Sequence, residues 1–288
     1  MVYLNNMEEL RAFVEAEGSP IKGLPEQFER SRITLDGVGS SITFGKGVIL
    51  DGAHLVIMAD DAHISIGNGS VVKAQVRAGY GSRVRIGRRL SSTGGGSISA
   101  AEGAVVRIGD DCMFAIHIDV RADHGHPIFD RRTGDRVNPS RKVVIGDHVW
   151  LGPYVKVFPG AHVMEGSVIG SGSLVSGRIP ANSVAVGTPA RVVRRNIIWD
   201  KRHLCSQNEG RFGNLADLEG RHWESALPIQ EHPAPVRKKK AGKKNRIARK
   251  QGKGKHGKAR KQGQAGKQGG LLNLRRRLTA FRKWLRSG

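Results

Sequence analysis

Aromatic residues are scarce in this sequence, since Phe, Trp and Tyr together make up 5% of its 288 residues. A buried core must therefore be built from Val, Ile, Leu and Ala. Only two cysteines occur, Cys112 and Cys205, which argues against a disulfide framework and against a cysteine-based zinc site. We expect both to be ordinary thiols in a reducing compartment.

Long apolar runs are also missing. The first eighteen residues, MVYLNNMEELRAFVEAEG, contain no uninterrupted apolar core and no cleavage-type end. No later segment is long enough to span a bilayer. From these absences we expect a cytoplasmic protein.

Acidic residues are absent from Pro233 onward, although 21 Lys and Arg residues lie there. The remainder of the chain has 27 basic and 25 acidic residues, so it is nearly neutral, and the net charge of +23 belongs to the C-terminal segment.

Residues 234–270 have few large apolar side chains and are predicted to be disordered. Residues 271–288 have apolar residues at helical spacing and predict a basic amphipathic helix, suited to an anionic membrane or another polyanion. Nucleic acid stays open as a partner of this segment.

Glycine is abundant, with 39 residues, and it closes a recurring four-residue phrase. The phrase ends at Gly45, Gly67, Gly87, Gly109, Gly146 and Gly170, as ITFG, ISIG, VRIG, VRIG, VVIG and SVIG. The first four copies are spaced by 22, 20 and 22 residues. A fixed spacing of this size indicates a repeat architecture.

A shorter period of six residues runs through the last part of the repeat. Aliphatic residues recur at Ile145, Leu151, Val157, Val163, Ile169 and Val175, and the positions four later are Val149, Val155, Ala161, Ser167, Ser173 and Ile179. Positions six apart point in different directions on a helix, but they suit a solenoid of short strands and tight turns. Three such strands form one triangular coil of about eighteen residues. The alternative, a β-sandwich, would alternate with period two.

Residues 31–194 resemble the hexapeptide-repeat acyltransferases. The most specific part runs from Val143 to Arg195 and ends in GTPARVVRR, similar to the closing coils of sugar and polysaccharide O-acetyltransferases. The resemblance implies an all-β, left-handed parallel β-helix with an extended loop, acetyl-CoA as donor, a glycan acceptor, and a homotrimer with active sites between chains. Residues 1–30 are expected to form a helical cap before it and residues 195–233 a cap segment after it.

The six-residue period fails between Val120 and Val143, where ADHGHPIFD occurs. Acetyl transfer to a hydroxyl needs a base with a pKa near the working pH, and histidine suits this role. The segment GHPI resembles the part of the family's loop that has the catalytic histidine, so His126 is the predicted base and His124 its rival. Asp123 and Asp130 are weaker candidates to orient the imidazole. The resemblance implies that Trp150 helps to form the acceptor pocket, with His124 and Asp123 assigned to the same pocket.

The donor site follows from the same resemblance. Gly152 and Pro153 would flank the thioester with backbone N–H groups nearby, although Pro153 itself lacks this hydrogen. Ser171 and Ser176 would line the cofactor arm, and Arg191 and Arg194 would meet the nucleotide phosphates. Ser176-Gly177 stand where many relatives have Thr-Lys, and whether the neighbouring Arg178 replaces the lysine stays open. GTPARVV also suits a final turn that closes the solenoid.

Three other functions share features with this sequence. A γ-class carbonic anhydrase shares the fold, and His126 and His162 match two of its zinc ligands, but its third position falls on Ser167. Other histidines, including His117 and His148, are expected at outward or corner positions. A nucleotidyltransferase would need a preceding domain with a Gly-rich nucleotide loop. The remaining alternative is a non-catalytic β-helix scaffold that binds an anionic polymer or membrane through its basic C-terminal segment.

Overall fold

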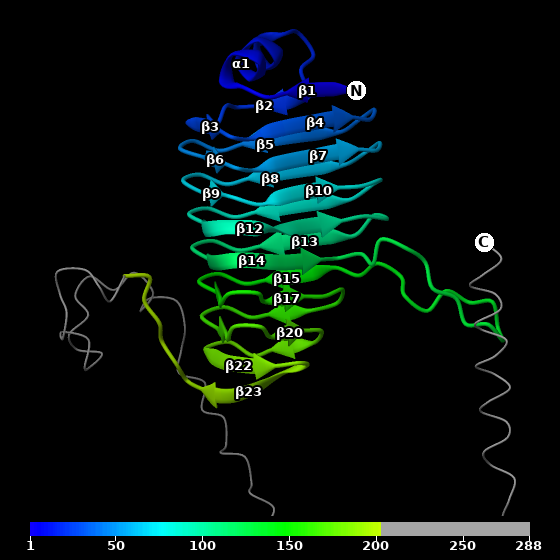
Figure 1. Ribbon diagram of the computed structural model, residues 1–288, viewed down its shortest axis with the longest axis vertical. Coiled ribbons are helices and arrows are strands. Elements are labelled where there is room, and N and C mark those ends of the chain that lie inside the picture. The colour runs from blue at the N-terminus through cyan, green and yellow to red at the C-terminus, as the bar shows by residue number, and fades with distance from the viewer. Residues whose placement is uncertain (203–288) are drawn as a thin grey trace, which may run out of the picture. The chain divides into compact units, whose positions relative to one another are not determined.

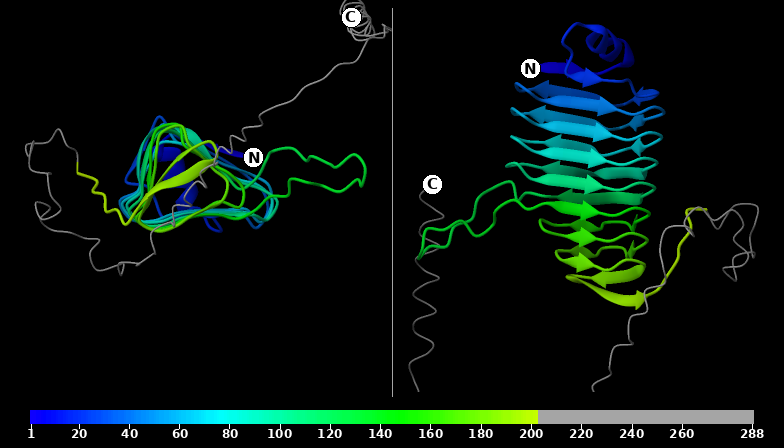
Figure 2. Two further views of the ribbon diagram at one scale, coloured as in Figure 1. Left: turned by 90° about the horizontal axis from the view of Figure 1, so that it is seen from below. Right: turned by 180° about the vertical axis from the view of Figure 1, so that it is seen from behind.

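The computed structural model describes residues 1–202. Nearly all regular structure in this part is β-strand, and the strands stack as successive coils of a solenoid (Figure 1). The view along the stack in Figure 2 shows a triangular cross-section, with three flat sides joined by corners. We call these sides face A, face B and face C. The predicted solenoid of short parallel strands is confirmed.

Face B is one eight-stranded parallel sheet. In stacking order its strands are β2 (Ile21–Lys22), β5 (Ser41–Phe44), β8 (His63–Ile66), β11 (Arg83–Ile86), β13 (Val105–Ile108), β15 (Val143–Ile145), β18 (His162–Val163) and β21 (Arg178–Ile179).

Faces A and C are joined because two long strands, β12 (Ser91–Ala100) and β14 (Met113–Arg121), run across the corner between them. Face A also contains β4 (Arg32–Asp36), β7 (His54–Met58), β10 (Gln75–Ala78), β17 (Lys156–Val157) and β20 (Leu174–Val175). Face C also contains β3 (Gln27–Glu29), β6 (Ile49–Asp51), β9 (Val71–Val72), β16 (Trp150–Leu151), β19 (Val168–Ile169) and β22 (Ser183–Gly187).

Coil length changes along the stack. In the N-terminal coils 22 residues separate Val76 from its partner Ile98, whereas 18 residues separate Val157 from Val175. The strands of faces A and B have four or five residues in most of the early coils and two in the late ones. The 22-residue and six-residue spacings of the sequence therefore describe two sizes of the same triangular coil.

The core fills the inside of the triangle. All six aliphatic residues from Ile145 to Val175 at six-residue spacing are at most 1% exposed, and so are Ser167 and Ser173 of the second set. Because a buried hydroxyl needs a partner, Ser167 Oγ donates to Pro180 O at 2.8 Å. The buried Cys112 thiol makes a similar corner contact with Gly146 O at 3.2 Å, and burial raises the pKa of this thiol to about 12. Cys112 is a free thiol, as expected.

Each end of the stack is closed differently. At the N-terminal end α1 (Met7–Glu15) lies across the first coil and buries Leu10, while β1 (Val2–Leu4) pairs antiparallel with β4 (Figure 1). At the other end β23 (Ala190–Arg195) folds back antiparallel onto β22. The helix lies within the expected cap of residues 1–30, but β2 and β3 are already strands of the first coil. The solenoid therefore begins before residue 31, because Ile21 and Phe28 already have their side chains in the core.

Candidate active site

A loop of residues 122–142 leaves the solenoid at the corner between faces A and B, after β14 and before β15. It extends well away from the stack (Figure 1). Its two arms are joined by a bridge between Phe129 and Arg136 and by a hydrogen bond from Val137 N to Ile128 O at 2.8 Å. The predicted interruption between Val120 and Val143 is thus a hairpin-like loop inserted between two coils.

Asp123 anchors the first arm of this loop. Its side chain is 3% exposed and accepts hydrogen bonds from Ser99 Oγ at 3.0 Å and Gly125 N at 3.0 Å. Arg77 Nη2 lies 3.2 Å from the same carboxylate. A buried carboxylate needs such partners, so Asp123 is directed into face A. In the described residues these partners, and no imidazole, contact its carboxylate, and its assignment to the acceptor pocket stays a prediction.

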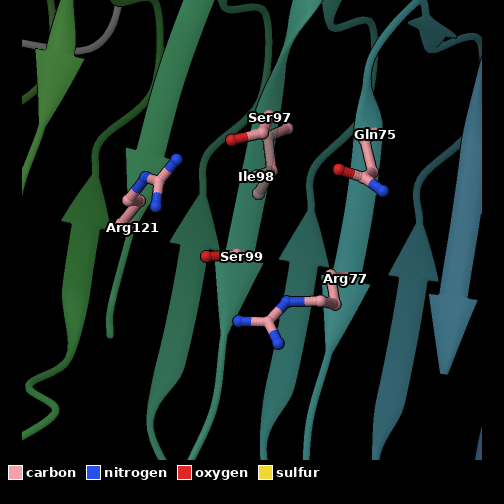
Figure 3. A pocket seen from close by; sticks show the side chains of 6 residues that line it. All are labelled: Gln75, Arg77, Ser97, Ile98, Ser99 and Arg121. Atoms are coloured by element: carbon pink, nitrogen blue, oxygen red, sulfur yellow. The ribbon is translucent and has the colours of Figure 1, made fainter. Parts of the chain in front are cut away.

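A hollow on face A adjoins this anchor, and Figure 3 shows its lining on three neighbouring strands. The lining residues are Gln75, Arg77, Ser97, Ile98, Ser99 and Arg121. Both arginines of the hollow are neutralised within the chain, Arg77 by Asp123 and Arg121 by Asp119, whose carboxylate lies 2.8 Å from Arg121 Nε. The hollow therefore has hydroxyl groups but little uncompensated charge.

Glu102 anchors the second arm from the corner turn of the preceding coil, between β12 and β13. Its carboxylate forms a two-pronged ion pair with Arg136, at 2.7 and 2.8 Å, and accepts a hydrogen bond from Ser140 Oγ at 2.6 Å. These hydrogen bonds lower the pKa of Glu102 to about 2. Because the pKa is lowered in the folded state, this anchor stabilises the loop above pH 4.5 and loses its effect as the pH falls towards 2.

Replacing Arg136 with glutamine should raise the titration midpoint of Glu102 from about 2 towards its ordinary value of 4.5, because the main hydrogen-bond donor to the carboxylate is lost. The midpoint is measurable by NMR of the side-chain carboxyl carbon. Arg131→Gln is the matched control, since Arg131 is an exposed loop arginine with no ion pair in residues 1–202. Equal midpoints in the two variants would contradict the anchor.

His126 lies in the first arm with its side chain exposed. Its main chain is held by Asn138, which is 8% exposed. Asn138 Nδ2 donates to His126 O at 2.8 Å, and Asn138 Oδ1 accepts from Ile128 N at 2.6 Å. Asn138 thus fixes the backbone on both sides of Pro127 and leaves the imidazole free to act. Sequence reasoning missed Asn138, whose only signal was an Asn before Pro in a polar loop.

The other polar residues near His126 have separate roles. Asp130 caps a turn by accepting from Arg132 N at 2.7 Å and Thr133 N at 3.3 Å, and these backbone hydrogen bonds lower the pKa of Asp130. No imidazole contacts it in the described residues, and its role in orienting one stays a prediction. His124 is exposed on the loop.

Trp150 lies on face C, 36% exposed, with its ring tilted against Trp199 at 5.8 Å. Trp199 also stacks on His148 at 4.0 Å, and His148 Nδ1 lies 2.8 Å from Asp111. Burial would raise the pKa of Asp111, but hydrogen bonds from His148 and Lys201 outweigh it and lower the pKa to about 2. Residues 196–202 are thereby fixed to the corner between faces B and C. Within one chain, Trp150 is not brought to His126, whose loop leaves from another corner.

Gly152, Pro153 and Ser171 come together at the corner between faces C and A. A methyl group on Gly152 would lie 3.0 Å from Ser171 N and 3.2 Å from Ser171 Oγ. Gly152 and Pro153 are predicted to flank the thioester with backbone N–H groups nearby, and the N–H of Gly152 itself donates to Ile169 O at 2.8 Å in the coil ladder. Ser171 is exposed, and its N–H makes no backbone hydrogen bond in the described chain.

The remaining predicted donor residues lie elsewhere on the last coils. Ser176 is exposed at the corner between faces A and B, next to Arg178, whose Nη2 lies 3.0 Å from Met164 Sδ. Arg191 and Arg194 are exposed on β23, opposite Val186 and Val184. The segment GTPARVV forms the turn and hairpin that end the solenoid, as expected.

The residues at the zinc-ligand positions of the carbonic anhydrase alternative lie in different parts of the coils. His162 lies on an outward position of β18, and Ser167, the third position, is a buried corner residue. No group of three or more His, Cys, Asp or Glu side chains is arranged to hold a metal within residues 1–202. His117 and His148 occupy corners with positive φ, as expected of corner residues.

None of the helices in this part is both long and apolar enough to cross a bilayer.

Comparison with known proteins identifies relatives of this solenoid. A family model described as bacterial transferase hexapeptide (six repeats) matches residues 142–177. The polysialic acid O-acetyltransferase of Escherichia coli O1:K1 / APEC is 34% identical over 150 residues, 51% of this chain and 48% of that protein. The galactoside O-acetyltransferase of Escherichia coli K12 is 33% identical over 141 residues, 48% of this chain and 67% of that protein. The chain thus spans about half the length of the first relative and two thirds of the second.

A solved structure has the same architecture. The crystal structure of the polySia-specific acetyltransferase NeuO matches with a TM-score of 0.61 and 30% identity, over 68% of this chain and 89% of that one. The family model covers the coils that contain Trp150, Gly152 and Ser171. The chain therefore belongs to the bacterial hexapeptide-repeat transferase family, with the left-handed parallel β-helix of its acetyltransferases.

Proposed function

We propose that this protein is an O-acetyltransferase that moves an acetyl group from acetyl-CoA to a hydroxyl of a cell-surface polysaccharide or a saccharide precursor. The observation that carries the proposal is the loop of residues 122–142, which is tethered by Asp123, Glu102 and Asn138 and presents an exposed His126. Relatives of this chain are named O-acetyltransferases of polysialic acid and of galactosides.

His126 acts as the general base in this reaction. Its imidazole takes the proton of the acceptor hydroxyl while the hydroxyl oxygen attacks the thioester carbonyl. The carbon–sulfur bond then breaks, and the CoA thiolate leaves with the proton returned by the imidazolium. No covalent enzyme intermediate is needed, because holding both substrates together removes much of the barrier. Cys112 is excluded as a nucleophile because its thiol is buried and its pKa is raised to about 12.

Ser171 is the proposed donor to the oxyanion of the tetrahedral intermediate. Pro153 has no N–H, and the N–H of Gly152 is used in the coil ladder. Ser171 lies directly over Gly152 and has an unused backbone N–H and an exposed hydroxyl. Such a preorganised donor is worth roughly 3–4 kcal/mol in acyl transfer. Ser176, Arg191 and Arg194 are assigned to the cofactor arm and nucleotide end of the donor.

The complete site is assigned to the interface between neighbouring copies in a homotrimer. In one chain the loop with His126 leaves the corner between faces A and B, whereas Gly152 and Ser171 lie at the corner between faces C and A. Trp150, assigned to the acceptor pocket, lies on face C. A second copy can therefore supply the corner that the loop of the first copy must reach.

The location of the protein belongs to the same proposal. We place it in the cytoplasm, where acetyl-CoA is available, with residues 234–288 drawing it to the inner face of a membrane or another polyanion. The expected cap of residues 195–233 continues beyond the described residues. Residues 234–270, predicted to be disordered, residues 271–288, predicted to form a helix, and Cys205 lie entirely outside them.

The test is to incubate the full chain with acetyl-CoA and a panel of glycans and to analyse the products by mass spectrometry. We expect an O-acetylated glycan and an equal amount of free CoA. Calorimetry with acetyl-CoA alone separates the proposal from the scaffold alternative, which predicts no donor binding. Absence of donor binding together with absence of any acetylated glycan would overturn the proposed function.

A further inference from the structure

Face B has a row of outward side chains in direct register across all eight strands. From the N-terminal coil onward the row reads Lys22, Thr43, Ser65, Arg85, Arg107, Val144, His162 and Arg178. A second row beside it reads Ser41, His63, Arg83 and Val105. Neither row contains an acidic residue, so the centre of face B is a strip of cations and hydroxyl groups.

Three arginines of this strip lack the carboxylate partner that several other arginines of the solenoid have. Within residues 1–202, Arg83, Arg85 and Arg107 are exposed and form no ion pair. Ion pairs with carboxylates hold Arg30, Arg77, Arg88, Arg121 and Arg136. Two acids in the corner turns beside face B have arginine partners outside the strip, since Glu102 binds Arg136 and Asp110 binds Arg88. Within the described residues, no carboxylate forms an ion pair with Arg83, Arg85 or Arg107.

Arg85 and Arg107 lie directly opposite each other on adjacent parallel strands. Neighbouring strands are about 4.8 Å apart, and like charges in facing positions destabilise a sheet. A fold stabilised only by its core gains nothing from this arrangement. The juxtaposition therefore indicates an anionic ligand that neutralises both guanidinium groups.

The residue types of the strip indicate which class of polyanion it binds. Its outward positions contain no Phe, Tyr or Trp, which argues against single-stranded nucleic acid, because that binding relies on stacking of bases on aromatic rings. A hollow of the strip is lined by the hydroxyl groups of Ser41, Thr43 and Ser65 next to Arg83 and Arg85. Hydroxyl groups beside guanidinium groups suit a chain that has both carboxylates and sugar hydroxyls.

We propose that face B is the binding surface for an acidic polysaccharide, which lies along the solenoid axis with its carboxylates on Arg83, Arg85 and Arg107. This inference rests on the proposed function and deepens it by naming the acceptor class. Arg107 faces Val144 of β15, the strand that follows the loop with His126. A glycan on the strip therefore passes the root of that loop, where the chain leading to the base leaves the coil.

The test uses the full chain and a fluorescein-labelled polysialic acid oligomer, without acetyl-CoA. Arg85→Gln/Arg107→Gln should weaken binding about tenfold, because charge-assisted hydrogen bonds are lost at two positions. Arg11→Gln/Arg32→Gln is the matched control: both arginines are exposed, lie off face B and form no ion pair in residues 1–202. It removes the same charge and should leave the affinity unchanged. A labelled dextran should bind all variants equally weakly.

Several outcomes would overturn the inference. Equal losses in the two double variants would show that only net charge matters. An equally large loss of duplex DNA binding in Arg85→Gln/Arg107→Gln would reassign the strip to nucleic acid. Unchanged thermal melting of that variant confirms that it folds, and removing a like-charge pair should not lower its stability.

This binding assay is independent of turnover, so it separates the two proposals. Arginine-dependent glycan binding without any acetyl transfer would overturn the proposed function and leave the binding surface in place. Acetyl transfer to an acidic glycan with an unchanged KM in Arg85→Gln/Arg107→Gln would overturn the surface and leave the function in place. If both hold, KM for the acidic acceptor rises about tenfold while kcat is retained.

Discussion

Replacing His126 with alanine should lower the rate of acetyl transfer by about 10²- to 10⁴-fold, the contribution of a positioned general base. The loss should appear in kcat, because the acceptor hydroxyl can still bind but its proton has no acceptor as the oxygen attacks. Acetyl-CoA binding should be retained. Steady-state kinetics with the best glycan of the panel, together with calorimetry of the donor, would measure both effects.

The structure makes His126→Ala an interpretable variant. The side chain of His126 is exposed, and only its main-chain oxygen is used by the fold, as the acceptor from Asn138. The anchors at Asp123 and Glu102 do not involve the imidazole. The loop should therefore keep its position, and an unchanged melting temperature would confirm this.

His124→Ala is the matched control for the same prediction. His124 is exposed on the same arm, two residues away, and its replacement removes an equal imidazole. We expect it to keep kcat, with any effect of its assignment to the acceptor pocket confined to KM. Full activity of His126→Ala with a large loss in His124→Ala would transfer the role of base to His124, and full activity of both would remove histidine catalysis from the loop.

The repeat made most of the fold predictable. A period of six residues determines which side chains point inward, so Leu151 and Val157 were expected in the core and are fully buried. The failure of the period located the loop to within a residue of its observed ends at Arg121 and Val143. Periodicity is a local property of the chain, and a solenoid is built almost entirely from contacts between successive coils.

The site was less predictable, because its polar contacts join residues that are distant in sequence. Asp123 pairs with Arg77, 46 residues away, and with Ser99, 24 residues away. No local pattern indicates such partners, so Asp123 seemed available to an imidazole or an acceptor. The sequence also could not show that the coil ladder uses the N–H of Gly152, because this hydrogen bond follows from the register between coils and not from residue type.

The core of the late coils should be the most sensitive part of the fold, and Leu151→Ala should lower the free energy of unfolding by about 2–5 kcal/mol. Leu151 is fully buried, between Phe114 of the coil before and Ile169 of the coil after. Loss of its side chain opens a cavity that both neighbouring coils border. The change is measurable by chemical denaturation followed by circular dichroism.

Leu174→Ala provides the matched comparison, because Leu174 occupies an outward, partly exposed position on β20, opposite Lys156. The same atoms are removed, but no cavity forms inside the triangle, so the loss should stay below about 1 kcal/mol. Equal losses would contradict the inward and outward assignment of the six-residue period.

Leu151 also lies between Trp150 and Gly152, and a collapse of its cavity would shift the coil that positions them. We therefore expect Leu151→Ala to reduce acetyl transfer even at temperatures where the chain stays folded, whereas Leu174→Ala should not.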